Sequence, residues 1–250
     1  RQMCIRDRCK VIYEKCRDDF NRPYFEEITK KIYKRGIFMY NFRTDLALER
    51  RDLYKRANNI ENEVDGIETE EEKVDEDIRI TRVKVLNENG EKAIGKKVGN
   101  YITIDINNLK IAGQEQIQKA SDTLTKELKE LLKKHIGEQE PILVVGLGNL
   151  YVTPDALGPK VVQDIDITRH ILQYMPEVLD KDTRPVSAIS PGVLGTTGIE
   201  TLEILKGIVD NIKPKLLLII DALASRSIER ISSTCLLYTS PSPRDISGSR

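Results

Sequence analysis

Two aspartates, Asp155 and Asp221, are the side chains of this sequence whose types and positions best suit acid/base chemistry. Asp155 lies in the segment GLGNLYVTPDALG after the apolar run 142–145, and Asp221 directly follows the apolar run 216–220. Such runs are typical of buried strands in a parallel sheet, whose carboxyl ends share one edge. We therefore expect the two carboxylates to converge there. When two carboxyl groups meet in a partly desolvated cleft, one keeps a proton while the other acts as a base toward water, so the pair predicts hydrolysis.

Helix capping by the same two residues stays open as a structural interpretation. The segment TPDALG suits Asp155 for capping the helix that follows, and Asp221 is placed to cap the next one. Capping and catalysis are compatible, so the spacing alone does not choose between them.

Polar residues in the loops after the strands are expected to support the site. The loops are the GLGN turn, the Gly/Thr-rich loop SPGVLGTTGIE and the segment IDALASRSIER. The supporting residues that we select from them are Asn149, Thr196, Thr197, Glu200 and Arg226.

The sequence has two histidines, which limits the kinds of catalysis that need an imidazole. His135 ends a predicted helix, where the exposed carbonyls favour a cation. His170, in DITRHIL, has three open roles: a packed helix residue, a hydrogen-bond donor to the site, or a metal ligand together with Asp155 and Asp221. No GxSxG elbow is present, so a serine nucleophile of that kind is excluded.

The glycines after the first apolar run favour a nucleotide site only weakly. Gly146 and Gly148 match the first two glycines of GxGxxG, but Tyr151 stands where close helix packing requires Gly or Ala. A P-loop is excluded because the sequence has no GxxxxGK[ST].

Composition excludes several other classes of function. The 250 residues include 40 Lys and Arg and 40 Asp and Glu, so net charge offers no reason to expect nucleic acid as a direct partner. No apolar run reaches the roughly 18 residues of a membrane helix. The cysteines are confined to the two ends, at Cys4, Cys9, Cys16 and Cys235, so the body has neither a Cys nucleophile nor a thiolate metal site. A cytoplasmic location fits this cysteine usage.

The C-terminal half alternates strand and helix patterns, which predicts an α/β fold with a mainly parallel sheet and flanking helices. The runs 142–145, 186–189 and 216–220 are expected as buried strands, and the segments 156–174 and 199–212 as helices. Right-handed crossovers would place every strand's carboxyl end on the edge where open α/β sheets bind ligands.

The N-terminal half has a different pattern. The strongly acidic segment 58–77 is expected as a solvated loop. Alternation over 78–86 and 101–106, with the turn residues NENG at 87–90, predicts an antiparallel strand region. Apolar residues at helical spacing over 114–135 predict an amphipathic helix packed on one face.

The longest motifs resemble the spore germination protease family. RTDLALE, IGKKVGNYITI, VVGLGNLYVTPDALGPKVV, TRHI, RPVSAISPGVLGTTGIET and KPKLLLIIDALASRSIERISST match it in order, over nearly all of 39–234. The resemblance implies an endopeptidase made as a zymogen and assembled as a homotetramer in the spore core. Its implied substrates are the small acid-soluble proteins that coat spore DNA, which it begins to degrade during germination.

The same resemblance implies an atypical aspartic peptidase whose assigned aspartates fall on Asp155 in TPDALG and Asp221 in IDALASR. One would deprotonate the attacking water while the other, protonated, polarises the scissile carbonyl. No cofactor is expected from this reading. The family has also been classed among metallopeptidases, so a divalent metal stays open.

A more distant similarity is to the hydrogenase maturation endopeptidases, and it implies their phosphorylase/hydrolase-like fold. Their GxGN turn, downstream acidic residue and following glycine correspond to Asn149, Asp155 and Gly158. In those proteins acidic residues and a histidine hold nickel, so a metal-dependent peptidase with His170 as a ligand is an alternative. A non-catalytic α/β module that binds a nucleotide or peptide through the GLGN turn and the GTTG loop is a further one.

The two ends of the chain are interpreted separately from its body. We expect 1–38 to be leader or artefactual sequence, with Met39 as the true start, and 235–250, CLLYTSPSPRDISGSR, to be an artefactual tail without periodicity.

The body, 39–234, is expected as an incomplete peptidase domain. It divides into an N-terminal β region, 39–113, and an α/β catalytic core, 114–234. Because the family continues beyond ISST, we expect elements of the substrate cleft to be missing, which would leave this chain inactive.

Overall fold

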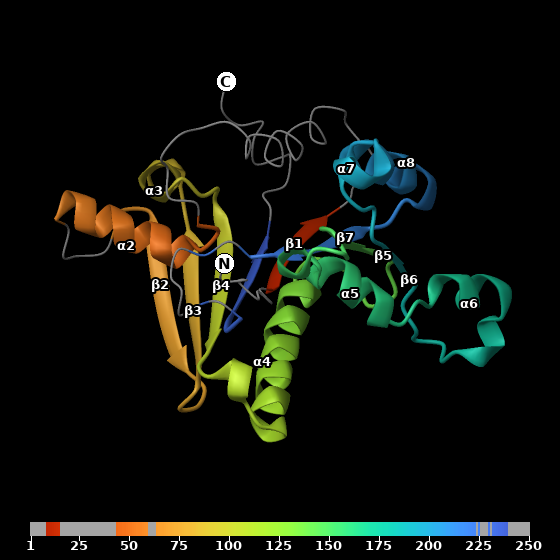
Figure 1. Cartoon of the computed structure of the whole chain (residues 1–250), viewed down its shortest axis with the longest axis horizontal. Helices are drawn as coiled ribbons and strands as arrows, with labels where there is room; N and C mark the ends of the chain where they lie inside the picture. Colours follow the sequence, from red (N-terminus) through yellow and green to blue (C-terminus); the bar gives the residue numbers. More distant parts are fainter. Residues whose placement is uncertain are drawn as a thin grey trace.

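The strands of the computed structural model form a single sheet (Figure 1). The structure describes residues 9–15, 44–59, 64–223, 225, 230 and 232–239. Across these residues the strand order is β2-β3-β4-β8-β1-β7-β5-β6. In chain order the strands are β1 (Cys9–Lys15), β2 (Ile67–Lys73), β3 (Ile78–Val85), β4 (Gly99–Ile106), β5 (Ile142–Gly146), β6 (Val186–Ile189), β7 (Leu216–Ala222) and β8 (Thr234–Thr239).

Three strands are parallel, as predicted: those that precede the GLGN turn, the Gly/Thr-rich loop and the segment after Asp221. β5 lies between β6 and β7 and pairs in parallel with both. The helices α5 (Leu157–Asp164) and α6 (Arg169–Tyr174) connect β5 to β6, and α8 (Thr201–Ile212) precedes β7. The carboxyl ends of β5, β6 and β7 therefore share one edge of the sheet.

The sheet as a whole is mixed, because the antiparallel strand region predicted for the N-terminal half lies in the same sheet as the three parallel strands. The pairs β2–β3, β3–β4, β4–β8 and β1–β7 are antiparallel, and β1 pairs with β8 in parallel. The sequence analysis predicted parallel pairing for the strands linked by helical crossovers and antiparallel pairing for the strands over 78–86 and 101–106, and both are observed. It missed β1 and β8, which join the parallel and antiparallel parts.

Strand β8 runs into the segment 235–250, where the sequence analysis predicted no element. Cys235, Leu236 and Leu237 are buried, and the strand lies between β4 and β1. The sequence analysis grouped this short apolar run with the Ser/Pro-rich sequence that follows it, and therefore did not identify it as a strand. β1 likewise lies within 1–38, where no element was predicted.

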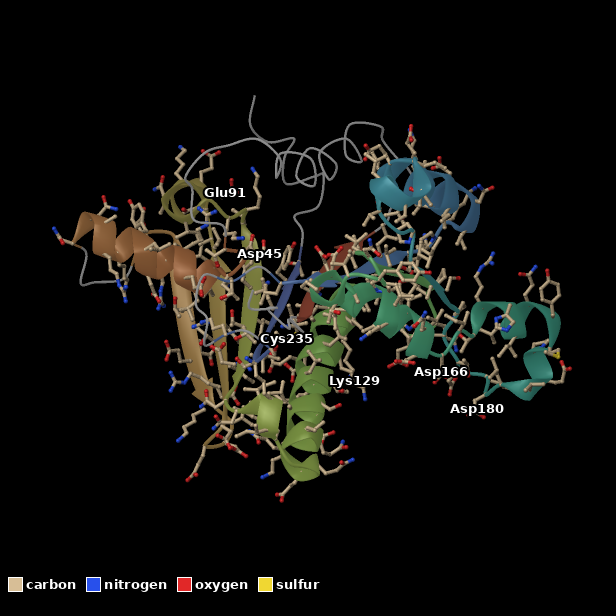
Figure 2. All side chains as sticks on the ribbon, in the orientation of Figure 1. Asp45, Glu91, Lys129, Asp166, Asp180 and Cys235 are labelled. Atoms are coloured by element: carbon tan, nitrogen blue, oxygen red, sulfur yellow. The ribbon has the colours of Figure 1, made fainter. Side chains whose placement is uncertain are left out.

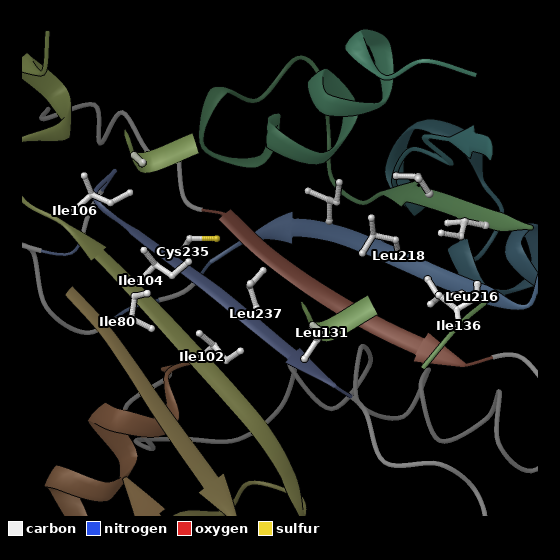
Figure 3. Packing of buried hydrophobic residues seen from close by; sticks show 14 of the residues in the cluster. Ile80, Ile102, Ile104, Ile106, Leu131, Ile136, Leu216, Leu218, Cys235 and Leu237 are labelled. Carbon is white, nitrogen blue, oxygen red and sulfur yellow. The ribbon is translucent and has the colours of Figure 1, made fainter. Parts of the chain in front are cut away.

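The long amphipathic helix predicted over 114–135 is present as α4 (Gln114–Lys133). It packs one face on the sheet, and its Leu131 lies in the same core cluster as Leu216 and Leu218 of β7 (Figure 3). Among the described residues, no helix combines the length and the apolar character that crossing a membrane requires.

The strands β5 and β7 are buried on both faces. Val144 and Leu218 belong to the cluster that α4 and α5 cover, whereas Val145 and Leu217 belong to a cluster with Leu205 of α8. Helices on both faces explain why these strands appear in the sequence as continuous apolar runs.

The N-terminal region contains helices as well as strands. The helix α2 (Ala47–Asn58) begins after the fully buried Leu46 and packs in a cluster with Val83 of β3 and Leu236 of β8. This cluster also includes Ile94 at the end of the short helix α3 (Glu88–Ile94).

The acidic segment 58–77 is not wholly a loop, because it contains strand β2. This strand lies at the edge of the sheet and pairs with β3. Basic residues of β3 face its carboxylates: Arg82 lies 2.7 Å from Glu72, and Lys84 lies 3.7 Å from Glu68. The acidic sequence of β2 can therefore form a strand, because cross-strand ion pairs and the exposed edge position accommodate its carboxylates. Its composition alone is more typical of a loop.

The predicted turn at 87–90 is instead the start of α3. The Oδ1 atom of Asn87 accepts the backbone N–H of Asn89 at 3.0 Å and of Gly90 at 3.1 Å. Asn is favoured both in turns and at helix N-caps, and here the cap is formed. The strands β3 and β4 on either side pair antiparallel, as predicted.

The single helix predicted over 156–174 is divided into α5 and α6. The chain becomes extended at Ile165, and the hydroxyl oxygen of Thr168 accepts the N–H of Val186 at 2.9 Å. Thr168 is thereby attached to the first residue of β6, which interrupts the helix between its two parts.

Candidate active site

Glycines let the chain fold back against the end of β5. A Cβ at Gly146 would lie 2.1 Å from the carbonyl oxygen of Gly158, and one at Gly158 would lie 2.4 Å from that of Leu147. Gly148 has a φ of +121°, and a Cβ there would lie 2.0 Å from the carbonyl oxygen of Asp155. Internal packing therefore requires these glycines, which accounts for the Gly-x-Gly pattern without a dinucleotide.

Asp155 ends the short 3-10 helix η2 (Thr153–Asp155) and is held by the GLGN turn. The N–H of Asn149 donates to Oδ2 of Asp155 at 2.9 Å and to its carbonyl oxygen at 3.1 Å. The N-cap of α5 is Ala156, and no side chain bonds to the first amides of the helix. The capping interpretation is therefore wrong for Asp155.

Asp221 lies near the end of β7, on the strand next to β5. The N–H of Leu147 donates to the carbonyl oxygen of Ile220 at 2.8 Å, which attaches the turn after β5 to the residue before Asp221. The N–H of Ala222 donates to Oδ1 of Asp221 at 2.8 Å. Both aspartates are half-buried. The structure thus places them on the same sheet edge, as the argument from strand ends expects.

The pKa of Asp155 is raised above the usual value of an Asp. Burial, which disfavours the ionised carboxylate, is the main cause, and the nearby charge of Asp221 adds to it. The hydrogen bond from the N–H of Asn149 acts in the opposite direction. Asp155 therefore keeps its proton to a higher pH than an ordinary Asp does. A pair of this kind can supply both an acid and a base.

A pocket of about 250 Å³ opens beside this turn. Its walls come from the turn 148–151, from α5 and from the loop that follows β6. Gly148 and Asn149 form part of the pocket wall, and both also contact Asp155. One wall of the pocket is therefore the turn that holds Asp155.

Of the predicted supporting residues, Asn149 and Thr196 reach this pocket. The Oδ1 atom of Asn149 accepts the N–H of Tyr151 at 3.0 Å, so its side chain shapes the turn. The hydroxyl groups of Thr196 and Thr197, both in α7 (Leu194–Thr197), donate to the carbonyl oxygen of Val193 at 2.9 and 3.2 Å.

The other two supporting residues are placed differently. Glu200 precedes α8, and its carbonyl oxygen accepts the N–H of Ile204 at 3.3 Å, so its backbone starts the helix. Arg226 lies outside the described residues.

The predicted metal set is not assembled in the part of the chain that the structure describes. No group of three or more His, Cys, Asp or Glu side chains there could hold a metal ion. His170 is exposed on α6, which lies beyond β6 at the end of the sheet (Figure 1). Asp166 and Asp180, which flank α6, mark this end of the molecule in Figure 2.

Three pocket residues were missed by the sequence analysis. Pro159, Val162 and Gln163 lie on α5 at positions i, i+3 and i+4, which share one helix face. That spacing was readable in the sequence, but only the fold shows that this face adjoins the GLGN turn.

Comparison with known proteins shows that the chain is similar to germination proteases. The family model described as germination protease matches residues 45–241. A germination protease of Clostridium perfringens is 50% identical over 196 residues, which cover 78% of this chain and 59% of the relative. Those of Caldanaerobacter subterraneus and a Geobacillus species are 52% identical over 201 residues and 44% identical over 202 residues, covering 79% and 78% of this chain. The chain spans 54 to 59% of the length of these relatives.

Proposed function

Because the chain belongs to the germination protease family, we propose that it carries the catalytic pair of an endopeptidase that acts in spore germination. The observation that supports this most is the position of Asp155 and Asp221. Two half-buried carboxylates meet at the carboxyl edge of a parallel sheet, and the charge of one raises the pKa of the other. General acid/base hydrolysis needs a pair of this kind.

We assign the proton to Asp155 and the base to Asp221. The pKa of Asp155 is raised first by burial and then by the charge of Asp221, so Asp155 suits the role of the acid that polarises the scissile carbonyl. Asp221 would act as the base that takes a proton from the attacking water. The N–H of Asn149 fixes the position of the Asp155 carboxylate in either protonation state.

The substrates that we propose are the small acid-soluble proteins of the spore, in its cytoplasm. This rests on the family resemblance, as do the homotetramer and the zymogen form. Acidic residues outnumber basic ones within 39–234, which is compatible with basic or DNA-associated protein substrates.

We also propose that β5, its GLGN turn and α5 correspond to the first βα unit of the hydrogenase maturation endopeptidases. Gly158 supports this, since its contact with the turn lets α5 begin close to the end of β5. A metal-dependent reaction of the kind found in those enzymes is the alternative function. It would need a third ligand close to the aspartates, and exposed His170 is not grouped with them.

The test uses the chain extended to the full length of its relatives, with a purified small acid-soluble spore protein as substrate. Asp155→Asn and Asp221→Asn should each lower the cleavage rate by about 100-fold or more, because each removes an acid/base group. Asp164→Asn and Asp210→Asn, at exposed positions of α5 and α8, are matched controls that should cleave at the normal rate. Circular dichroism checks that every variant is folded. Cleavage at the normal rate by either active-site variant would contradict the assignment.

A further inference from the structure

The pocket beside the GLGN turn has no part in the acid/base mechanism described above, yet one of its walls is the turn that holds Asp155. Asn149 lines the pocket while its N–H donates to the Asp155 carboxylate at 2.9 Å. A Cβ on Gly148, which also lines the pocket, would lie 3.2 Å from Cγ of Asp155. A side chain next to a peptide bond at Asp155 would therefore lie close to the turn that forms this wall of the pocket.

The residues that line the pocket are all uncharged in the part of the chain that the structure describes. The turn contributes Leu150 and Tyr151, and α5 contributes Val162 and Gln163. The facing loop contributes small residues, of which Thr196 is the largest. Since no lining residue carries a charge, a charged side chain entering here would lose hydration without gaining an ion pair.

The volume of the pocket suits one side chain. Its 250 Å³ is below the range of about 300 to 1,000 Å³ that is typical of sites for whole small molecules. The nearby Tyr151 is 89% exposed and Leu194 is 47% exposed, so apolar surface continues outside the opening. Such a surface would contact the rest of an extended peptide, whereas a dinucleotide would need a larger cavity.

We propose that this pocket binds one uncharged side chain of the substrate next to the scissile bond, and that Gln163 and Thr196 determine which side chain it accepts. The inference rests on the proposed peptidase function. Gln163 and Thr196 are suited to this role because both are exposed and they line the pocket from two different elements, α5 and α7. Neither belongs to a core cluster, so both can be changed without removing buried packing.

The experiment measures kcat/KM for a series of peptides derived from one cleaved sequence. Leu, Gln, Glu or Lys is placed in turn at each of the two positions that flank the scissile bond. The unaltered enzyme should prefer Leu or Gln over Glu by about tenfold or more at one of these positions. Gln163→Lys and Thr196→Lys should each raise cleavage of the Glu peptide at that same position by about tenfold, because the new ammonium group pairs with it.

Two further variants keep the test independent of a single substitution. Gln163→Glu should favour the Lys peptide instead, and Gln163→Ala should improve cleavage of a peptide with Phe at that position by several-fold, since it enlarges the pocket. Gln173→Lys is the matched control, because it is the same substitution at an exposed position of α6. It should leave the preference unchanged.

The proposal is overturned if the Gln163 and Thr196 variants, shown to be folded and active, keep the preferences of the unaltered enzyme at both positions. It is also overturned if the unaltered enzyme accepts Glu as well as Leu at both. These results differ from failure of the proposed function, in which Asp155→Asn or Asp221→Asn would still cleave.

Discussion

The N–H of Asn149 lies 2.9 Å from Oδ2 of Asp155, so the turn after β5 holds the carboxylate that the proposed mechanism uses as an acid. The same N–H is 3.1 Å from the carbonyl oxygen of Asp155. Both contacts depend on the close approach of the 3-10 helix η2 to the GLGN turn. The glycines of the GLGN turn are thus needed to position the Asp155 carboxylate.

Gly148→Ala should disrupt the close contact between the GLGN turn and η2. The new Cβ would lie 2.0 Å from the carbonyl oxygen of Asp155, and the φ of +121° is itself strained for alanine. We expect a loss of about 2 kcal/mol or more in the free energy of unfolding, measured with urea, and a fall in cleavage rate of at least tenfold. Gly195→Ala is the matched control, because a Cβ there has no neighbour within 4 Å. Equal stability of the two variants would show that the turn can move away from η2.

The stability of the protein should depend on pH through Asp155. Its pKa in the folded state is raised above the usual 3.8, so ionisation costs more in the folded than in the unfolded chain. The stability that Asp155 contributes is therefore fully present at a pH below its pKa in the unfolded chain. It is lost as the pH rises through the higher pKa of Asp155 in the folded chain. Asp155→Asn removes this loss, so the variant should gain stability relative to the unaltered protein between about pH 4 and about pH 7.

Urea unfolding at both pH values measures this difference. Asp221→Asn serves as the comparison, because it removes the charge that contributes to the raised pKa while leaving Asp155 in place. Its own gain should be smaller than that of Asp155→Asn, since burial is the larger cause. The raised pKa of Asp155 would be contradicted by one result in particular. This result is a difference in the free energy of unfolding, between Asp155→Asn and the unaltered protein, that stays the same across this pH range.

The parts of the fold that the sequence predicted correctly depend on local patterns. The apolar runs of β5 and β7 and the amphipathic pattern of α4 each identify their own element, because burial on both faces or on one face leaves a readable spacing. The position of Asp155 and Asp221 on one edge then follows from the parallel pairing of these strands. No knowledge of distant contacts was needed for that step.

The elements that the sequence analysis missed depend on partners far away in the chain. The carboxylates of β2 are accommodated because Arg82 and Lys84 face them from β3. For the same reason Gln163 could not be connected to the site, since its role depends on where α5 lies against the GLGN turn.

Glu127→Gln on α4 should destabilise the fold, because it leaves Arg82 without one of its charged partners. Glu127 is 2% exposed, and its Oε1 lies 2.6 Å from a guanidinium nitrogen of Arg82. We expect a loss of about 2 to 3 kcal/mol in the free energy of unfolding, less than for a fully buried pair because Arg82 also binds Glu72. Glu130→Gln, at an exposed position of the same helix, should change it by less than about 0.5 kcal/mol. Equal effects of the two substitutions would show that the ion pair does not fasten α4 to the sheet.

Glu49→Gln should slow catalysis by loosening the segment that follows Asp221. Glu49, on α2, accepts a hydrogen bond from the hydroxyl of Ser225 at 3.1 Å and lies 3.6 Å from Nε of Arg230. Arg230 in turn lies 3.3 Å from Asp105 of β4. These contacts attach the chain after β7 to two other elements of the N-terminal region.

Replacing the Glu49 carboxylate by an amide keeps its size but removes the charge. We expect a loss of about 1 to 2 kcal/mol in stability and a several-fold fall in kcat with a smaller change in KM, because Ser225 and Arg230 belong to the segment that follows Asp221 and do not line the pocket. Asp52→Asn is the control, since Asp52 is on the same helix and its carboxylate pairs with the adjacent Arg51. Steady-state kinetics on the spore protein substrate separates kcat from KM. A Glu49→Gln variant that lost stability but retained its full kcat would show that the segment after β7 holds Asp221 in place without this contact.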